Sequence, residues 1–151
     1  MELKKILNVD AKDVYDSIIT SIKYDIEQAT GKEISKEDIY EGYSYIKEMT
    51  TKTSNKGNIT VTIEELKEPL VYACRFTSRQ GDNYIKYEIN SLEEGMCEVT
   101  YSEDFDGSSK SKNWNYKLVM MFYKRSFNKK ANTLLGNIEK YISNLGVSEE
   151  W

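Results

Sequence analysis

The feature that most constrains the fold is residues 43–105, where apolar and polar side chains alternate between short turns. Tyr72, Cys74 and Phe76, for example, occupy every second position of one run. A period of two is typical of a half-buried β-strand, because successive side chains point to opposite faces. Short turns favour antiparallel pairing of strands that are neighbours in sequence. The predicted strands lie near residues 43–51, 59–64, 70–78, 84–92 and 96–105.

A strand and a helix are predicted before this stretch. Residues 2–9 alternate like one further short strand, and residues 11–30 carry apolar side chains every three or four positions. That spacing is typical of a helix with one buried face. Asp10 and Gly31 stand at the two ends of the helix, where we expect a side-chain N-cap and a left-handed C-cap.

The C-terminal part predicts the longest element of the chain. Apolar residues recur at helical spacing from Tyr116 to Leu145 without a proline, and Gly146 is the expected end of this helix. The order strand, helix, five antiparallel strands and helix predicts an α+β fold. No linker or repeat is visible, so we expect one domain over residues 1–147 and a flexible tail at residues 148–151.

The chain of 151 residues contains twelve tyrosines and no histidine. Without an imidazole ring it has no Ser/His/Asp or Cys/His catalytic set and no His metal ligand. Cys74 and Cys97 lack metal-ligand spacing, and as they fall on strands with one strand between them they would lie about 10 Å apart. That separation is too long for a disulfide. We therefore expect free buried thiols, no metal site and no cofactor.

Charge and hydropathy narrow the partners and the location. The net charge of −4 argues against a chain whose whole surface binds nucleic acid. The N-terminus is charged at every two or three positions, unlike a secretory signal. The longest apolar run, Leu118 to Tyr123, has six residues, against about 20 for a membrane span. We expect a cytoplasmic protein with no membrane-spanning helix.

Several short runs accompany this order of elements. They are Asn-Tyr-Lys-Leu at 115–118, Tyr-Lys-Arg-Ser at 123–126 and Ile-Glu-Lys-Tyr-Ile at 138–142, with Gly42 and Tyr45 in the predicted second strand. The chain resembles the helix-grip superfamily, which includes START lipid-transfer domains, the birch-pollen allergen and polyketide cyclases. Within it, these runs are similar to an uncharacterised family of small bacterial proteins.

The resemblance implies a curved antiparallel sheet of about six strands wrapped around the long C-terminal helix, with an apolar cavity between them. It implies no catalytic residue. Many members of the superfamily have two short helices after the first strand, whereas here one long stripe at residues 11–30 predominates.

In such an arrangement, side chains of the sheet and the C-terminal helix face one another. The expected cavity residues are Tyr72, Phe76, Tyr87, Tyr101, Glu103, Tyr116, Tyr123 and Phe127. Buried tyrosine hydroxyls need hydrogen-bond partners, so the cluster suits a cavity that holds water or a polar ligand. An ordinary aromatic core with hydroxyls at its edge explains the same pattern, and both interpretations stay open.

Glu103 is the one candidate catalytic residue. It follows Tyr101 on the predicted inner face, where loss of water would favour the neutral carboxyl group and suit a general acid or base. Its position near the end of a strand leaves a second interpretation, in which the side chain reaches solvent at the rim.

The C-terminal helix offers two possible interaction surfaces. Apolar residues at 118–123, with Trp114, Leu118 and Met121 on a second face, favour either a homodimer or coverage by the first helix and the strand ends. Residues 107–140 contain eight basic and one acidic residue, so they carry +7 and the rest of the chain −11. The basic face could meet phosphate, anionic lipid or an acidic partner, or it is simply solvated. Its residues are Lys124, Arg125, Lys129 and Lys130.

Three functions are compatible with these patterns. The first is a non-enzymatic protein that binds a small apolar or amphipathic molecule between the sheet and the C-terminal helix. The second is a cyclase-like or hydrolase-like enzyme that uses Glu103 and tyrosine hydroxyls. The third is a protein-interaction or regulatory module that acts through the C-terminal helix.

Overall fold

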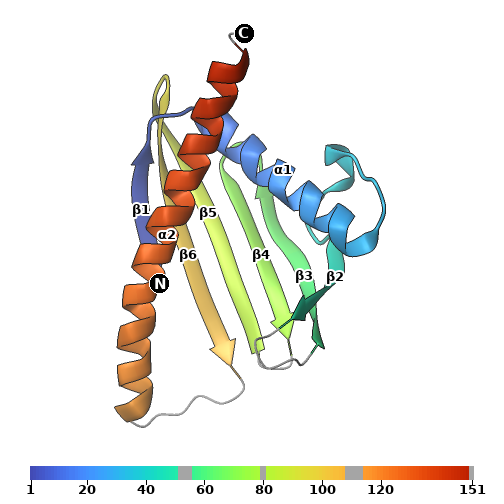
Figure 1. Cartoon of the computed structure of the whole chain (residues 1–151), viewed down its shortest axis with the longest axis vertical. Coiled ribbons are helices and arrows are strands. Elements are labelled where there is room, and N and C mark those ends of the chain that lie inside the picture. Colours follow the sequence, from blue (N-terminus) through green and yellow to red (C-terminus); the bar gives the residue numbers. More distant parts are fainter. Residues whose placement is uncertain (51–55, 79–80, 108–113, 150–151) are drawn as a thin grey trace.

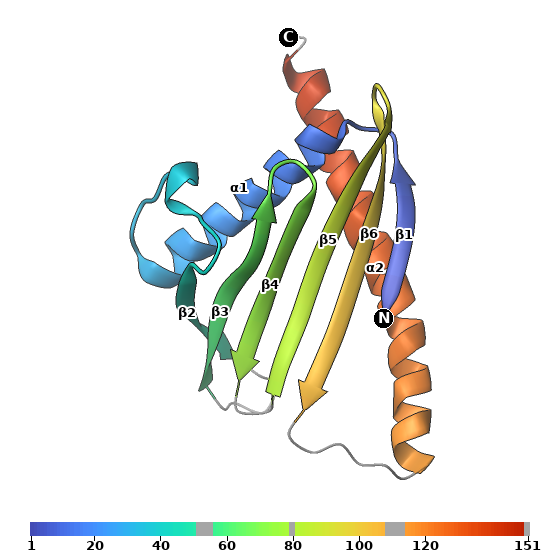
Figure 2. The same cartoon turned by 180° about the vertical axis from the view of Figure 1, so that it is seen from behind.

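The structure is a computed structural model that describes residues 1–50, 56–78, 81–107 and 114–149. Side chains are described for residues 1–48, 57–78, 81–106 and 124–145. Two long helices lie on one face of a six-stranded sheet (Figure 1). Figure 2 shows the opposite face, which no helix covers in the described part of the chain. The elements are β1 (Glu2–Leu7), α1 (Ala11–Thr30), the 3-10 turn η1 (Lys36–Asp38), β2 (Ser44–Thr50), β3 (Lys56–Lys67), β4 (Val71–Ser78), β5 (Gly81–Glu93), β6 (Met96–Gly107) and α2 (Trp114–Glu149).

The sheet has the strand order β1-β6-β5-β4-β3-β2, and every neighbouring pair is antiparallel. The predicted five-strand meander is therefore confirmed. Strand β1 pairs with β6, the last strand of the meander. In that pairing Leu3 lies opposite Tyr101 and Leu7 lies opposite Cys97. The two ends of the sequence thus meet at one edge of the sheet, and α2 lies beside β1 (Figure 1).

A β-bulge in β3 keeps the inner face of the sheet apolar. The register shifts between Ile63, which pairs with Cys74, and Glu65, which pairs with Ala73. One extra residue on the bulged strand lets Leu66 pair with Tyr72 on the face toward the helices. Without the extra residue a glutamate would occupy that inner position, because a slip of one residue exchanges the two faces.

Helix α1 has the bounds that its apolar stripe predicts, with Val14 and Ile26 fully buried. Gly31 adopts φ 71°, and its amide donates to the carbonyl of Glu27 at 2.9 Å, as expected of a C-cap. The predicted capping role of the Asp10 side chain is wrong. Its Oδ1 accepts instead from the amide of Gly95 at 2.6 Å, so it ties the start of the helix to the β5–β6 turn.

Helix α2 makes polar contacts with β1 and with the residue that follows it. Lys5 Nζ donates to Asn132 Oδ1 at 2.7 Å, and the amide of Asn8 donates to Glu139 Oε2 at 2.8 Å. The predicted end at Gly146 is wrong, because the helix continues to Glu149. A glycine inside a helix costs only about 1 kcal/mol relative to alanine, so it permits a stop without imposing one.

The tail predicted at residues 148–151 overlaps α2 at its first two positions, and residues 150 and 151 lie outside the described part. The single domain over residues 1–147 stays a prediction. Within the described residues, no helix is long and apolar enough to cross a membrane.

Candidate functional site

A cavity of about 330 Å³ lies between the sheet and the two helices. Ile18 and Ile22 of α1 form one side of it, and Leu134 and Ile138 of α2 form the other. Figure 1 shows the two helices diverging over the sheet, so that α1 crosses β2, β3 and β4 while α2 follows β1 and β6. The volume is at the small end of the range for ligand pockets, about 300 to 1,000 Å³.

The floor of the cavity comes from β4 and β5. Tyr72, Cys74 and Phe76 of β4 face the helices, as the alternation predicts, and Ile85 and Tyr87 lie opposite on β5. Burial raises the pKa of the Tyr72 and Tyr87 phenols above 10.0, and the nearby Cys74 raises them further. Burial also raises the pKa of the Cys74 thiol to about 11. At neutral pH these groups are therefore uncharged.

A polar cluster closes one part of the cavity wall. The Tyr45 hydroxyl donates to Asp25 Oδ2 at 2.5 Å, and Lys47 Nζ lies 3.2 Å and 3.3 Å from the two oxygens of the same carboxylate. Burial is the main cause that raises the pKa of Tyr45 above its ordinary value, and the hydrogen bond to Asp25 raises this pKa further. The Lys47 side chain is 24% exposed and that of Asp25 39%, so this cluster reaches solvent at the edge of the cavity. Ser17 and Ser21 line the same wall from α1.

Of the residues predicted for the cavity, Tyr72, Phe76 and Tyr87 lie in its wall. Tyr101 and Phe127 are buried beside it: their rings stack at 5.7 Å with an interplanar angle of 13°, and Tyr101 contacts Tyr87 at 5.0 Å. The side chains of Tyr116 and Tyr123 lie outside the described residues.

Glu103 does not reach solvent at the end of its strand, because it is only 6% exposed. The Tyr101 hydroxyl donates to its Oε2 at 3.1 Å, and Asn83 Nδ2 lies 3.5 Å from its Oε1. The rim interpretation of Glu103 is therefore wrong. The carboxylate belongs to a buried polar group beside the cavity, although it is not part of the cavity wall.

The predicted interaction residues of α2 are only partly described. The side chains of Trp114, Leu118 and Met121 lie outside the described residues. The basic residues Lys124, Arg125, Lys129 and Lys130 are all exposed.

The polar cluster was not predicted from the sequence, although its residues on α1 follow a regular spacing. Ser17, Ser21 and Asp25 recur every four residues beside the apolar stripe of α1, which marks a polar line at the edge of the buried face. The alternation of β2 places Tyr45 and Lys47 on one face. Only the packing of α1 on β2 brings these two lines together.

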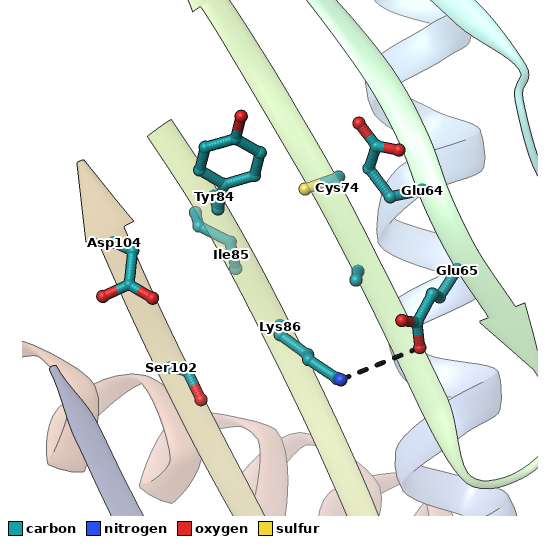
Figure 3. Close-up of a pocket in the computed structure, with 9 residues that line it drawn as sticks. Glu64, Glu65, Cys74, Tyr84, Ile85, Lys86, Ser102 and Asp104 are labelled. Atoms are coloured by element: carbon teal, nitrogen blue, oxygen red, sulfur yellow. Dashed lines mark ion pairs between the residues drawn. The ribbon is translucent and has the colours of Figure 1, made fainter. Parts of the chain in front are cut away.

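A second hollow of about 470 Å³ lies on the bare face of the sheet. Figure 3 shows its charged side chains, among them Glu65, Lys86 and Asp104, on the face away from the helices. Lys86 pairs with Glu65 at 3.8 Å and with Glu88 at 3.3 Å, so charges of both signs offset each other there. This hollow is larger than the cavity under the helices, but four of its nine lining residues are charged, and an apolar molecule would have to remove water from them.

Comparison with solved structures shows the same fold in proteins of very different sequence. A protein of unknown function from Staphylococcus aureus is 16% identical with a TM-score of 0.65, over 98% of this chain and 94% of that one. A START superfamily protein from Mycobacterium smegmatis is 10% identical with a TM-score of 0.58, over 93% and 97%. The Zhui aromatase/cyclase from Streptomyces sp. R1128 is 16% identical with a TM-score of 0.59, over 94% of each chain.

Comparison of the sequence with curated proteins found no match. A family described as a domain of unknown function, DUF3284, matches residues 1–124. That match covers β1 to the first part of α2, and therefore most of the cavity wall. The chain has the helix-grip fold of the START proteins and the aromatase/cyclase, and it belongs to the DUF3284 family.

Proposed function

We propose that this protein binds a small apolar or amphipathic molecule in the cavity between the sheet and the helices, without catalysing a reaction. The observation that carries the proposal is the uneven lining of the cavity. Aliphatic and aromatic side chains form most of its walls, whereas its two charged residues, Asp25 and Lys47, form an ion pair in one part of the wall. A ligand with an apolar body and one polar end matches that distribution.

The driving force would come from the apolar walls. Removing apolar surface from water yields about 25 cal/mol per Å², so a ligand of modest size gains several kcal/mol before its polar end makes any contact. Polar groups in such sites serve mainly to orient the ligand. The partly exposed Asp25 and Lys47 would therefore fix which end of the molecule faces solvent.

The catalytic alternative is supported less well. Glu103 and Tyr101 form a buried pair of the kind used in acid/base chemistry. Neither residue lines the cavity within the described part of the chain, so a ligand held there would not touch the carboxyl group. A binding role uses the residues that do line the cavity.

Native mass spectrometry of protein purified from its own host tests the proposal. We expect the wild type to carry a small molecule of defined mass. Ile138→Trp should lose it, because the larger side chain would fill the cavity from α2. Tyr141→Trp is the matched control, since Tyr141 lies on the same helix but is 48% exposed. A wild type that carries no molecule, or equal loading of the two variants, would contradict a ligand in this cavity.

A further inference from the structure

The polar part of the cavity wall contains an unused hydrogen-bond donor. Its carboxylate, Asp25, already accepts from the Tyr45 hydroxyl at 2.5 Å and from Lys47 Nζ at 3.2 Å. An ammonium group has three N–H donors. Among the described residues, Asp25 is the only hydrogen-bond partner of the Lys47 side chain, which leaves donor capacity at Nζ.

Lys47 lies in a part of the cavity wall that is largely shielded from water. Its side chain is 24% exposed, so most of it is removed from water. Its Nζ lies 5.8 Å from the centroid of the Phe76 ring, which also lines the cavity. A partly desolvated charge gains from further hydrogen bonds, and the aromatic ring supplies none.

A second donor stands close to this group on α1. Ser21 lines the cavity one helical turn before Asp25, and residues four apart lie on the same face of a helix. Ser21 is exposed, and its hydroxyl makes no hydrogen bond to any described residue. Ser21 and Lys47 thus offer two donors in the wall of the same cavity.

We propose that the cavity takes a small organic carboxylate, whose anionic head accepts hydrogen bonds from Lys47 and Ser21 at the mouth and whose apolar body lies on Phe76, Ile85 and Ile138. This inference rests on the proposed binding function and narrows its ligand class. An amine of the same size would meet the ammonium of Lys47 and would have to displace it from Asp25. A neutral alcohol would bind through the apolar walls alone.

Isothermal titration calorimetry with octanoate, 1-octanol and octylamine tests the inference, because the three probes share one tail and differ only in the head. We expect octanoate to bind about tenfold more tightly than 1-octanol, as one hydrogen bond to a charged group provides, and octylamine to bind most weakly. Lys47→Met should remove the preference for octanoate while 1-octanol still binds. Lys47→Arg should retain the preference and shows that the charge at this position is what matters.

The wild-type ranking tests the inference without any variant, so a misfolded Lys47→Met does not obscure the result. Equal affinity for octanoate and 1-octanol, or tightest binding of octylamine, would overturn the carboxylate inference and leave the apolar cavity as a binding site. If none of the three probes binds to the wild type, the binding function itself fails, and the inference fails with it. Binding of octanoate that Ile138→Trp leaves unchanged would place the probe outside the cavity and overturn both.

Discussion

Four aromatic side chains form a continuous row across the inner face of the sheet. The ring centroids of Tyr72 and Tyr87 are 6.1 Å apart, those of Tyr87 and Tyr101 5.0 Å, and those of Tyr101 and Phe127 5.7 Å. The row runs from the floor of the cavity to α2, and its Tyr101 hydroxyl holds the buried Glu103. These residues link the cavity to a buried polar group that the cavity wall does not include.

The first prediction concerns that hydroxyl. Tyr101→Phe should destabilise the protein by about 1.5 to 3 kcal/mol, because it removes a donor from a buried carboxyl group while it preserves the ring stack. Tyr84→Phe is the matched control, since Tyr84 is 38% exposed on the bare face of the sheet (Figure 3). Urea unfolding of both variants measures the difference. Equal effects of the two substitutions would show that the bond to Glu103 contributes nothing.

At the scale of single elements, two glycines differ in whether the backbone conformation requires a glycine. Gly31 ends α1 in the left-handed region, with φ 71°. Gly136 lies inside α2, where an added Cβ would meet only the flexible end of Lys5, its Nζ atom at 3.6 Å. The first position needs a glycine for its backbone conformation, and the second has no such need.

The same substitution should therefore change stability in opposite directions. Gly31→Ala should cost about 1 to 2 kcal/mol, since an L side chain in the left-handed region meets its own carbonyl. Gly136→Ala should add up to about 1 kcal/mol through the helix propensity of alanine. Thermal unfolding followed by circular dichroism measures both. A loss of stability in Gly136→Ala would mean that the contact of α2 with β1 tolerates no added atom.

Across the whole molecule, the face of the sheet toward the helices gathers weak acids that folding holds in the neutral form. Burial raises the pKa of the Cys74 and Cys97 thiols from 9.0 to about 11. Burial also raises the pKa of four phenols above 10.0, namely Tyr45, Tyr72, Tyr87 and Tyr101. Between pH 9 and 11 the folded state keeps protons on the two thiols that the unfolded state has released. Rising pH therefore favours the unfolded state.

The third prediction concerns this dependence of stability on pH. The contribution of these groups to the free energy of unfolding should be complete below pH 9 and should fall as pH rises toward 11, by about 2 kcal/mol for each thiol. Urea titrations at pH 8, 9, 10 and 11 measure the fall. The variant with both cysteines replaced by alanine should lose stability less steeply up to pH 10. A wild-type stability that is constant to pH 11 would contradict the neutral, buried state of these side chains.

Local patterns predicted most of the fold. The six strands, the face of Tyr72, Cys74 and Phe76, and the bounds of α1 all follow from periodicity, which depends only on residues close in sequence. The wrong predictions concern features that depend on a partner distant in sequence or on a weak conformational preference. Asp10 occupies the expected N-cap position, but its side chain accepts from Gly95, 85 residues away, instead of from its own helix.

The cavity was predicted less completely than the sheet. Its floor on β4 and β5 follows from alternation, but the expected walls were the sheet and the C-terminal helix, and the side formed by α1 was not foreseen. Glu103 and Tyr101 fall on the predicted face, yet they sit beside the cavity, because Tyr87 lies between Tyr101 and the cavity residue Tyr72.

By itself, the sequence determined the order of the elements and the face that each residue presents, because hydrophobic periodicity is a property of short segments. Only the tertiary structure decided which of these faces meet. The angle at which α1 crosses the sheet brings Asp25 to Tyr45 and Lys47, 20 and 22 residues further along the chain. That angle depends on how side chains of two elements pack together, which no single stretch of sequence encodes.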